Sequence, residues 1–295
     1  LASIRPANEQ SMKHASASSL QDAGSGACNA PRAALRERLR SAGARVEPIA
    51  QRIAGIALPR KCLLCGLRCQ SSGDQLPQGP FCPACDTAYW NEPRLRCTSC
   101  ALPLAALRAR RPSSARFVCP SCARVPPPFD ATLALADYRP PLDRLALGLK
   151  FHSRLAVARA FGKRLARLAD DHPACAPRPD VITPMPLAHA RLVARGFNQA
   201  WEIARPLACT LGVAAEPTLM RRVADTAQQS RLDREARRRN VAAAFGVSLP
   251  VRGLHVGLVD DVMTSGATLE AAARTLKAAG ARRVTCFVAL RTPQD

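Results

Sequence analysis

Eight cysteines in four C-x-x-C pairs constrain this chain more than any other feature of its sequence. The eight are Cys62, Cys65, Cys82, Cys85, Cys97, Cys100, Cys119 and Cys122. Two thiolates separated by two residues can face one ion from a tight turn, and two such turns complete a tetrahedral site with no open position. The spacing therefore predicts two structural zinc ions, each held by four thiolates.

The sequence leaves the pairing of these turns open. Sixteen residues separate the first pair from the second, and 18 separate the third from the fourth. The similar intervals favour sequential pairing, in which the cysteines from Cys62 to Cys85 share one ion and those from Cys97 to Cys122 share the other; interleaved pairing is the alternative. No βαβ pattern adjoins the pairs, which disfavours a thioredoxin-like redox role. The remaining cysteines are interpreted as free thiols, namely Cys28, Cys69, Cys175, Cys209 and Cys286.

The chain is strongly basic. Among its 295 residues, 43 are Lys or Arg and 22 are Asp or Glu, which gives a formal net charge of +21. This charge favours polyanionic or phosphorylated partners, although a solvated arginine-rich surface explains it equally well. No run of about 18 apolar residues predicts a transmembrane segment, and the N-terminus carries no secretory signal pattern. We therefore expect a cytoplasmic protein, with a peripheral position at the inner face of the membrane as an alternative.

Composition divides the chain into three parts. Residues 1–57 are predicted to be a disordered tail followed by a basic helix. Residues 58–124 hold the paired cysteines and are predicted to form a double zinc-binding domain. A proline-rich boundary then precedes residues 129–295, whose pattern is that of an α/β domain.

Strand and helix patterns alternate in the third part. Apolar runs predict strands at 131–138, 180–185, 255–260 and 284–290. Helical periodicity predicts helices at 142–169, 188–211 and 269–279, and a break near 151–153 in the first of them is left open. Strands that alternate with helices predict a mostly parallel sheet with helices on both faces.

The segment that is most informative about function is residues 258–268, LVDDVMTSGAT. An apolar strand leads into two carboxylates, and a short loop of hydroxyl residues then opens a helix at about Ala267. Backbone N–H groups, the helix dipole and three hydroxyls would surround one phosphate, and Gly266 lets the backbone approach closely. No Lys follows the glycine, so the loop is not a Walker A motif. The pattern predicts a phosphate site in this loop.

The paired acids, Asp260 and Asp261, need a partner other than the phosphate, which they would repel. Ribose hydroxyls donate hydrogen bonds to carboxylates, so the acid pair and the loop together favour a phosphorylated ribose over free phosphate. Two other interpretations stay open. One is an ordinary strand–turn–helix with an N-cap at Thr264 or Ser265. The other is a divalent-metal carboxylate site, which would need acids at further strand ends.

Three further blocks accompany this loop. The first is Pro184, Met185, Pro186 and Leu187, followed by R-G-F-N-Q from Arg195 to Gln199. The second comprises Thr226, Gln229, Leu232, Arg237, Asn240 and Phe245, and the third is the cysteine-rich segment ahead of P-P-F-D at 127–130. The loop resembles the phosphoribosyl-diphosphate signature of type I phosphoribosyltransferases. Together the blocks resemble the ComF family over about residues 58–292.

The resemblance implies a type I phosphoribosyltransferase-like fold behind an N-terminal zinc-binding unit. It implies that Asp260 and Asp261 bind the ribose hydroxyls and act in catalysis with Arg237, the best-placed cation of an arginine-rich lid. The 5-phosphate would be bound by Thr264, Ser265, Gly266, Ala267 and Thr268. Candidates for diphosphate contacts are Lys150, Met185, Pro186 and Arg195, and Mg²⁺ would arrive with the diphosphate.

The resemblance also implies a role in natural competence, in which imported single-stranded DNA is handled at the cytoplasmic side of the membrane. Two functions follow. The first is a phosphoribosyltransferase that uses phosphoribosyl diphosphate and an acceptor that the sequence does not identify. The second is a non-catalytic protein that binds phosphoribosyl diphosphate or a nucleotide while it assists DNA uptake, with single-stranded DNA and competence proteins as partners. A zinc-finger DNA reader is disfavoured, because the cysteine turns lack an evident recognition helix.

Overall fold

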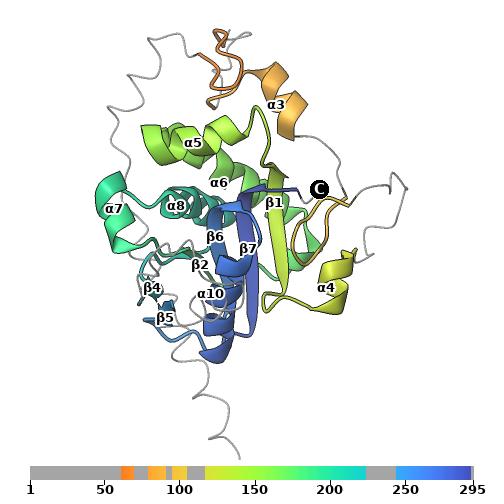
Figure 1. Cartoon of the computed structure of the whole chain (residues 1–295), viewed down its shortest axis with the longest axis vertical. Helices are drawn as coiled ribbons and strands as arrows, with labels where there is room; N and C mark the ends of the chain where they lie inside the picture. The colour runs from red at the N-terminus through yellow and green to blue at the C-terminus, as the bar shows by residue number, and fades with distance from the viewer. Residues whose placement is uncertain (1–60, 70–78, 91–94, 105–116, 224–243, 294–295) are drawn as a thin grey trace, which may run out of the picture.

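The computed structural model (Figure 1) describes residues 61–69, 79–90, 95–104, 117–223 and 244–293. The predictions for the tail and helix of 1–57, for Cys28, and for the block from Thr226 to Asn240 with Arg237 lie outside these ranges. Within the described ranges, no helix has both the length and the apolar character needed to cross a membrane.

A five-stranded parallel sheet forms the centre of the molecule (Figure 1). Its strands are β1 (Ala131–Asp137), β2 (Val181–Pro184), β3 (Ala214–Ala215), β6 (His255–Met263) and β7 (Arg283–Arg291). They lie in the order β1-β7-β6-β2-β3 and pair in parallel. β6 and β7 are apolar over most of their length because both faces of a central parallel strand are covered. The predicted sheet is confirmed.

Helices cover both faces of this sheet. The described helices of the sheet domain are α5 (Asp143–His152), α6 (Leu155–Asp170), the 3₁₀ helix η1 (Pro173–Cys175), α7 (His189–Arg195), α8 (Gln199–Leu211) and α10 (Ala267–Ala278). Buried residues of α5, α6 and α8 share one core with Val259 and Phe287. Buried residues of α10 share the other core with Val256 and Leu258. A small antiparallel pair, β4 (Met220–Arg222) and β5 (Phe245–Val247), was not predicted.

Two predicted helices are each divided in two. Between α5 and α6, Ser153 adopts a left-handed conformation with φ of 49°, so the break that was left open near 151–153 is present. The continuous helix predicted over 188–211 is wrong. Gly196 ends α7 with φ of 80°, and the Asn198 side chain begins α8 by accepting a hydrogen bond from the Ala200 N–H. A glycine C-cap followed by an asparagine N-cap stops one helix and starts the next.

β6 is longer than predicted. It continues to Met263, three residues past the expected end at Asp260, so Asp261 also lies within the strand rather than after it. The extension is paired, since Val262 lies opposite Leu290 and Met263 lies opposite Arg291. The last residues of β6 and β7 are therefore neighbours at the carboxyl edge of the sheet.

The first cysteine-rich segment packs on α6 through aromatic rings. This segment contains α3 (Pro83–Trp90). Trp90 lies 5.9 Å from Phe161 of α6 between ring centroids, and 5.5 Å from Phe81. The Arg164 guanidinium lies over the rings of Phe81 and Trp90, at 5.0 and 5.2 Å, and forms an ion pair with Asp86. These contacts attach the segment to the core beneath α6.

The second cysteine-rich segment lies along β1, the edge strand of the sheet. This segment contains α4 (Pro120–Arg124). The Thr132 N–H donates to the Thr98 carbonyl at 3.3 Å, and Arg96 forms a 2.9 Å ion pair with the buried carboxylate of Asp137. The segment therefore covers part of an edge that would otherwise present unpaired backbone groups.

Close packing between α6 and α8 depends on Gly162. A methyl group at this position would lie 2.5 Å from the Ile203 carbonyl oxygen and 2.5 Å from Cγ of Pro206. We expect Gly162→Ala to lower the free energy of unfolding by roughly 1–3 kcal/mol, because backbone and ring atoms cannot move aside cheaply. The measurement is chemical denaturation.

Gly148→Ala in α5 is the matched control. Its methyl group would meet Cδ of Arg154 at 2.9 Å, which belongs to a flexible side chain that can shift. We expect a change of less than about 1 kcal/mol, with a favourable contribution from the helix propensity of alanine. Equal destabilisation by the two substitutions would contradict this account of the packing.

Candidate functional site

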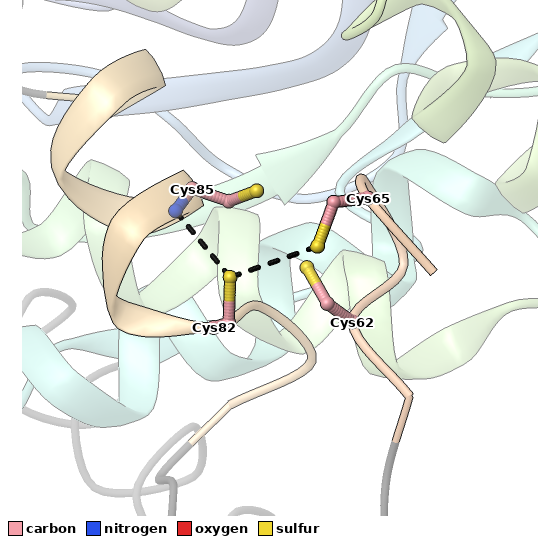
Figure 2. A group of neighbouring side chains, drawn as sticks. All are labelled: Cys62, Cys65, Cys82 and Cys85. Atoms are coloured by element: carbon pink, nitrogen blue, oxygen red, sulfur yellow. Dashed lines mark hydrogen bonds between the residues drawn. The ribbon is translucent and has the colours of Figure 1, made fainter. Parts of the chain in front are cut away.

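Each predicted group of four cysteines converges on one point. The ligand atoms of Cys62, Cys65, Cys82 and Cys85 lie within 4.8 Å of one another, and so do those of Cys97, Cys100, Cys119 and Cys122. Figure 2 shows the first group, in which the two turns face each other. Sequential pairing is confirmed, and the interleaved alternative is wrong.

The sulfur spacing suits a tetrahedral metal. Sγ of Cys65 lies 3.8 Å from Sγ of Cys82, and Sγ of Cys100 lies 3.8 Å from Sγ of Cys119. Four sulfurs at about 2.3 Å from a zinc ion are separated by about 3.8 Å along each edge of the tetrahedron. Both groups could therefore hold a structural zinc ion, with no coordination position left for water.

Hydrogen bonds favour one thiolate in each group before any metal arrives. Burial opposes ionisation of Cys62, yet N–H groups of Cys65, Cys82 and Leu64 lower its pKa to about 6. In the second group, a hydrogen bond from the Cys100 thiol lowers the pKa of Cys97 to about 4, against the effect of burial. Metal ligands bind as thiolates, so these arrangements prepare the sites for a cation.

The two groups differ in their access to solvent. Cys65 is exposed, and Cys82 and Cys85 are partly buried, whereas the cysteines of the second group are buried. Four further described cysteines lie outside both groups, namely Cys69, Cys175, Cys209 and Cys286. We expect reagents in solution to reach the first group more readily.

The phosphate loop, residues 264–268, connects β6 to α10 at the carboxyl edge of the sheet. Gly266 has φ of 86° and is the N-cap of α10; a methyl group on it would lie 2.6 Å from Cε of Met263. The alternative interpretation, with an N-cap at Thr264 or Ser265, does not match this N-cap, although Ser265 Oγ accepts a 3.4 Å hydrogen bond from the Ala267 N–H. Thr264, Ser265 and Thr268 are exposed. Free amides at the start of a helix and exposed hydroxyls suit an anion.

The two acids have different surroundings. Asp261 is 4 % exposed, and its carboxylate forms a 3.0 Å ion pair with Nζ of Lys150 on α5. Asp260 is partly exposed, and its Oδ1 accepts a 2.9 Å hydrogen bond from the Asp261 N–H. Burial and the neighbouring Asp261 carboxylate raise the pKa of Asp260 well above its usual range. Of these two acids, Asp260 is the one that is partly exposed, and Asp261 is the one that forms an ion pair with Lys150.

The other predicted site residues lie near this edge with partners of their own. Met185, directly after β2, is buried; its N–H donates to the Val259 carbonyl and its carbonyl accepts from Nδ2 of Asn198. Pro186 is partly exposed. Arg195 forms a hydrogen bond with the side chain of Gln199. The described ranges do not include Arg237.

The sequence analysis missed one buried cation at the site. Arg291 ends β7 and is 2 % exposed. Its Nη1 donates to the carbonyls of Met263, Thr264 and Thr292, and its Nε donates to the carbonyl of Cys100. An arginine at the end of an otherwise apolar strand was the available signal. The sequence alone could not tell which carbonyls it would meet.

The chain is similar to known proteins over most of its length. Residues 195–295 match the family described as "Phosphoribosyl transferase domain". The chain is 35 % identical over 239 residues to "DNA utilization protein YhgH" of Salmonella typhi, which covers 80 % of this chain and 99 % of that protein. It is 30 % identical over 177 residues to "Competence protein F" of Haemophilus influenzae, which covers 56 % of this chain and 75 % of that protein.

Among solved structures, the "allosteric regulatory enzyme of purine biosynthesis" is 20 % identical, with a TM-score of 0.34. That match covers 48 % of this chain and 30 % of the other chain.

Elemental analysis of the purified protein should find about two zinc ions per chain. Because Cys65 is exposed, we expect a chelator to release zinc in two phases, with the first group emptied first. Cys65→Ser should abolish the fast phase, and Cys122→Ser should abolish the slow one. A folded protein without metal would contradict the assignment.

Replacement of Asp260 by Asn should not weaken the fold. An acid whose pKa is raised on folding destabilises the native state when it is ionised; this cost is absent below about pH 4 and grows as the pH rises towards the raised pKa. Asp260→Asn should therefore melt no lower than the parent at pH 7.5, with a smaller advantage at pH 5.5, in thermal unfolding followed by circular dichroism. A variant that is less stable at both pH values would show that the carboxylate stabilises the fold.

Proposed function

Because this chain belongs to the ComF family, we propose that its C-terminal domain binds phosphoribosyl diphosphate and that the protein acts in the handling of imported single-stranded DNA. The observation that carries the ligand part is the arrangement of the 264–268 loop beside Asp260 at the carboxyl edge of a parallel sheet. Ligands of open α/β sheets gather at this edge. A phosphate group and a sugar hydroxyl are the two partners that these groups suit best.

In this proposal the 5-phosphate binds at the start of α10. Backbone N–H groups of the loop and first turn donate to its oxygens, with the hydroxyls of Thr264, Ser265 and Thr268 and the positive end of the helix dipole beside them. The close approach of the backbone at Gly266 and Ala267 is part of the same site. Any other residue at position 266 would have a strained backbone, and its side chain would meet Met263.

The ribose hydroxyls would bind the carboxylate of Asp260. Asp261 would act through its partner, because its carboxylate already holds Lys150. The ammonium group of Lys150 has three donors, so it can contact a phosphate oxygen while it keeps its ion pair. The 3.0 Å pair would thus hold a cation next to the sugar without leaving a buried acid uncompensated.

The diphosphate would lie between Lys150, Arg195 and the backbone at Met185 and Pro186. Among the described residues, Arg195 pairs with a neutral amide and with no carboxylate, so its charge is not compensated. A planar guanidinium suits phosphate oxygens. Mg²⁺ would enter with the diphosphate and keep most of its own water.

If transfer occurs, an acceptor displaces pyrophosphate from C1 of the ribose: the C1–O bond to the diphosphate breaks as the new bond forms. Positive charge develops on the sugar and negative charge on the leaving group. Fixed cations and backbone donors supply the stabilisation, with Arg237 as a further candidate. A non-catalytic protein that uses the same site to bind phosphoribosyl diphosphate or a nucleotide is the second candidate function, and it is favoured by the same loop geometry.

The DNA part of the proposal rests on the relatives and on charge. Their names are "DNA utilization protein YhgH" and "Competence protein F". A net charge of +21 favours polyanionic partners, single-stranded DNA among them. Competence proteins are further proposed partners.

Calorimetry with phosphoribosyl diphosphate and Mg²⁺ tests the ligand site. We expect the parent to bind, and Asp260→Asn to bind at least about tenfold more weakly, because hydrogen bonds to a charged carboxylate contribute roughly 1.5–3 kcal/mol. Asp171→Asn, at an exposed acid after α6, is the control and should bind as the parent does.

No binding by the folded, zinc-loaded parent would rule the proposal out. Pyrophosphate release separates the two functions. Release in the presence of free bases, amines or single-stranded DNA identifies an enzyme and its acceptor. Ligand binding without release identifies the non-catalytic function.

A further inference from the structure

Arg291 connects three segments that are far apart in the sequence. Its Nε donates to the Cys100 carbonyl at 2.9 Å, and its Nη1 donates to Met263 at 3.1 Å, to Thr292 at 2.7 Å and to Thr264. The four acceptors are carbonyl oxygens, and no described carboxylate forms an ion pair with this arginine. The guanidinium is 2 % exposed and, among the described residues, only neutral carbonyl groups hold it. Burying such a charge is costly, so these hydrogen bonds are needed to keep it in place.

These hydrogen bonds determine where the amides of the phosphate loop point. In a trans peptide, the C=O of one residue and the N–H of the next point in opposite directions. The bonds after Met263 and Thr264 are trans. Because their carbonyls point at Arg291, the N–H groups of Thr264 and Ser265 point away from it, toward the outside of the loop.

Arg291 also contributes charge behind these amides. A cation next to the carbonyl ends of two peptide dipoles increases the positive character at their N–H ends. Arg291 itself stays out of contact with solvent, so its charge is weakly screened. Both effects favour an anion on the outer side of the loop.

The fourth hydrogen bond leads to the second cysteine group. Cys100 contributes its thiol to this group, with Sγ 3.8 Å from that of Cys119, while its carbonyl accepts from Arg291. A metal ion on the thiol would fix the backbone of Cys100 and thereby the position of the guanidinium. The second cysteine group is thus linked to the phosphate loop through the Cys100 carbonyl and then through Arg291.

We propose that Arg291 is a positioning residue that directs the amides of Thr264 and Ser265 toward the ligand's 5-phosphate, and that metal binding at the second cysteine group supports it through the Cys100 carbonyl. This inference rests on the proposed function, since it concerns the same loop. It predicts that the affinity for a sugar phosphate depends more on the second cysteine group than on the first.

Arg291→Met tests the first part. Methionine keeps a long apolar side chain in the buried space but removes the charge and all four hydrogen bonds. With ribose 5-phosphate as the probe in calorimetry, we expect at least about tenfold weaker binding. In the proposed function, pyrophosphate with Mg²⁺ binds at Lys150 and Arg195 rather than at the loop, so its binding should be unchanged in the same variant.

Arg283→Met is the matched control, since Arg283 begins the strand that Arg291 ends. It should bind ribose 5-phosphate as the parent does. If the parent binds ribose 5-phosphate and the Arg291→Met variant binds it with equal affinity, the inference is overturned and the proposed function is left intact. A parent that binds neither ribose 5-phosphate nor phosphoribosyl diphosphate overturns the proposed function itself.

Two cysteine variants test the second part and do not require the Arg291 variant to fold. Cys65→Ser and Cys122→Ser should each reduce zinc to about one ion per chain. We expect the affinity for ribose 5-phosphate to fall at least about fivefold further in Cys122→Ser than in Cys65→Ser. Equal affinities in the two variants would overturn the link between the metal and the loop.

Discussion

Parallel pairing of β6 with β2 and β7 places the carboxyl ends of these strands at one edge of the sheet. The segment after β2, the phosphate loop after β6 and the final residue of β7 therefore meet there, although more than 100 residues separate the first from the last. The extension of β6 to Met263 matters for the same reason. It brings the start of the loop beside Arg291. The pairing of β6 with β7 therefore lets Arg291 donate hydrogen bonds to the first carbonyls of the loop.

The same edge gathers charged groups that are wholly or partly buried. Asp260 has a raised pKa because burial and Asp261 oppose its ionisation. Asp261 is balanced by Lys150, whereas Arg291 is balanced by carbonyl dipoles alone among the described residues. Groups whose charge is costly in the native state tend to gather where a ligand is bound. A phosphorylated sugar would supply hydroxyl donors for the acid and oxygen anions for the cations, and would reduce this cost.

The two cysteine-rich segments pack against the sheet and share its cores. Each is too small to bury a sufficient core of its own, and a metal ion supplies the missing free energy in units of this kind. Their cysteines nevertheless belong to the two cores of the sheet: Cys62 and Phe81 join the core beneath α6, and Cys97 with Cys100 joins the core beneath α10. The cysteine groups and the sheet therefore share their cores, and the second cysteine-rich segment lies along the edge strand β1.

Local patterns in the sequence determined the parts of this protein that depend on near neighbours. The C-x-x-C spacing gave both cysteine groups, and apolar runs and periodicity gave the parallel sheet with the loop before α10. The stop and start at Gly196 and Asn198 were also local signals, although they were overlooked. Only the tertiary structure decided that Lys150 pairs with Asp261 and that Arg291 meets the carbonyls of the loop. Partners of this kind are brought together by strand order and helix packing, which the periodicity of one segment does not encode.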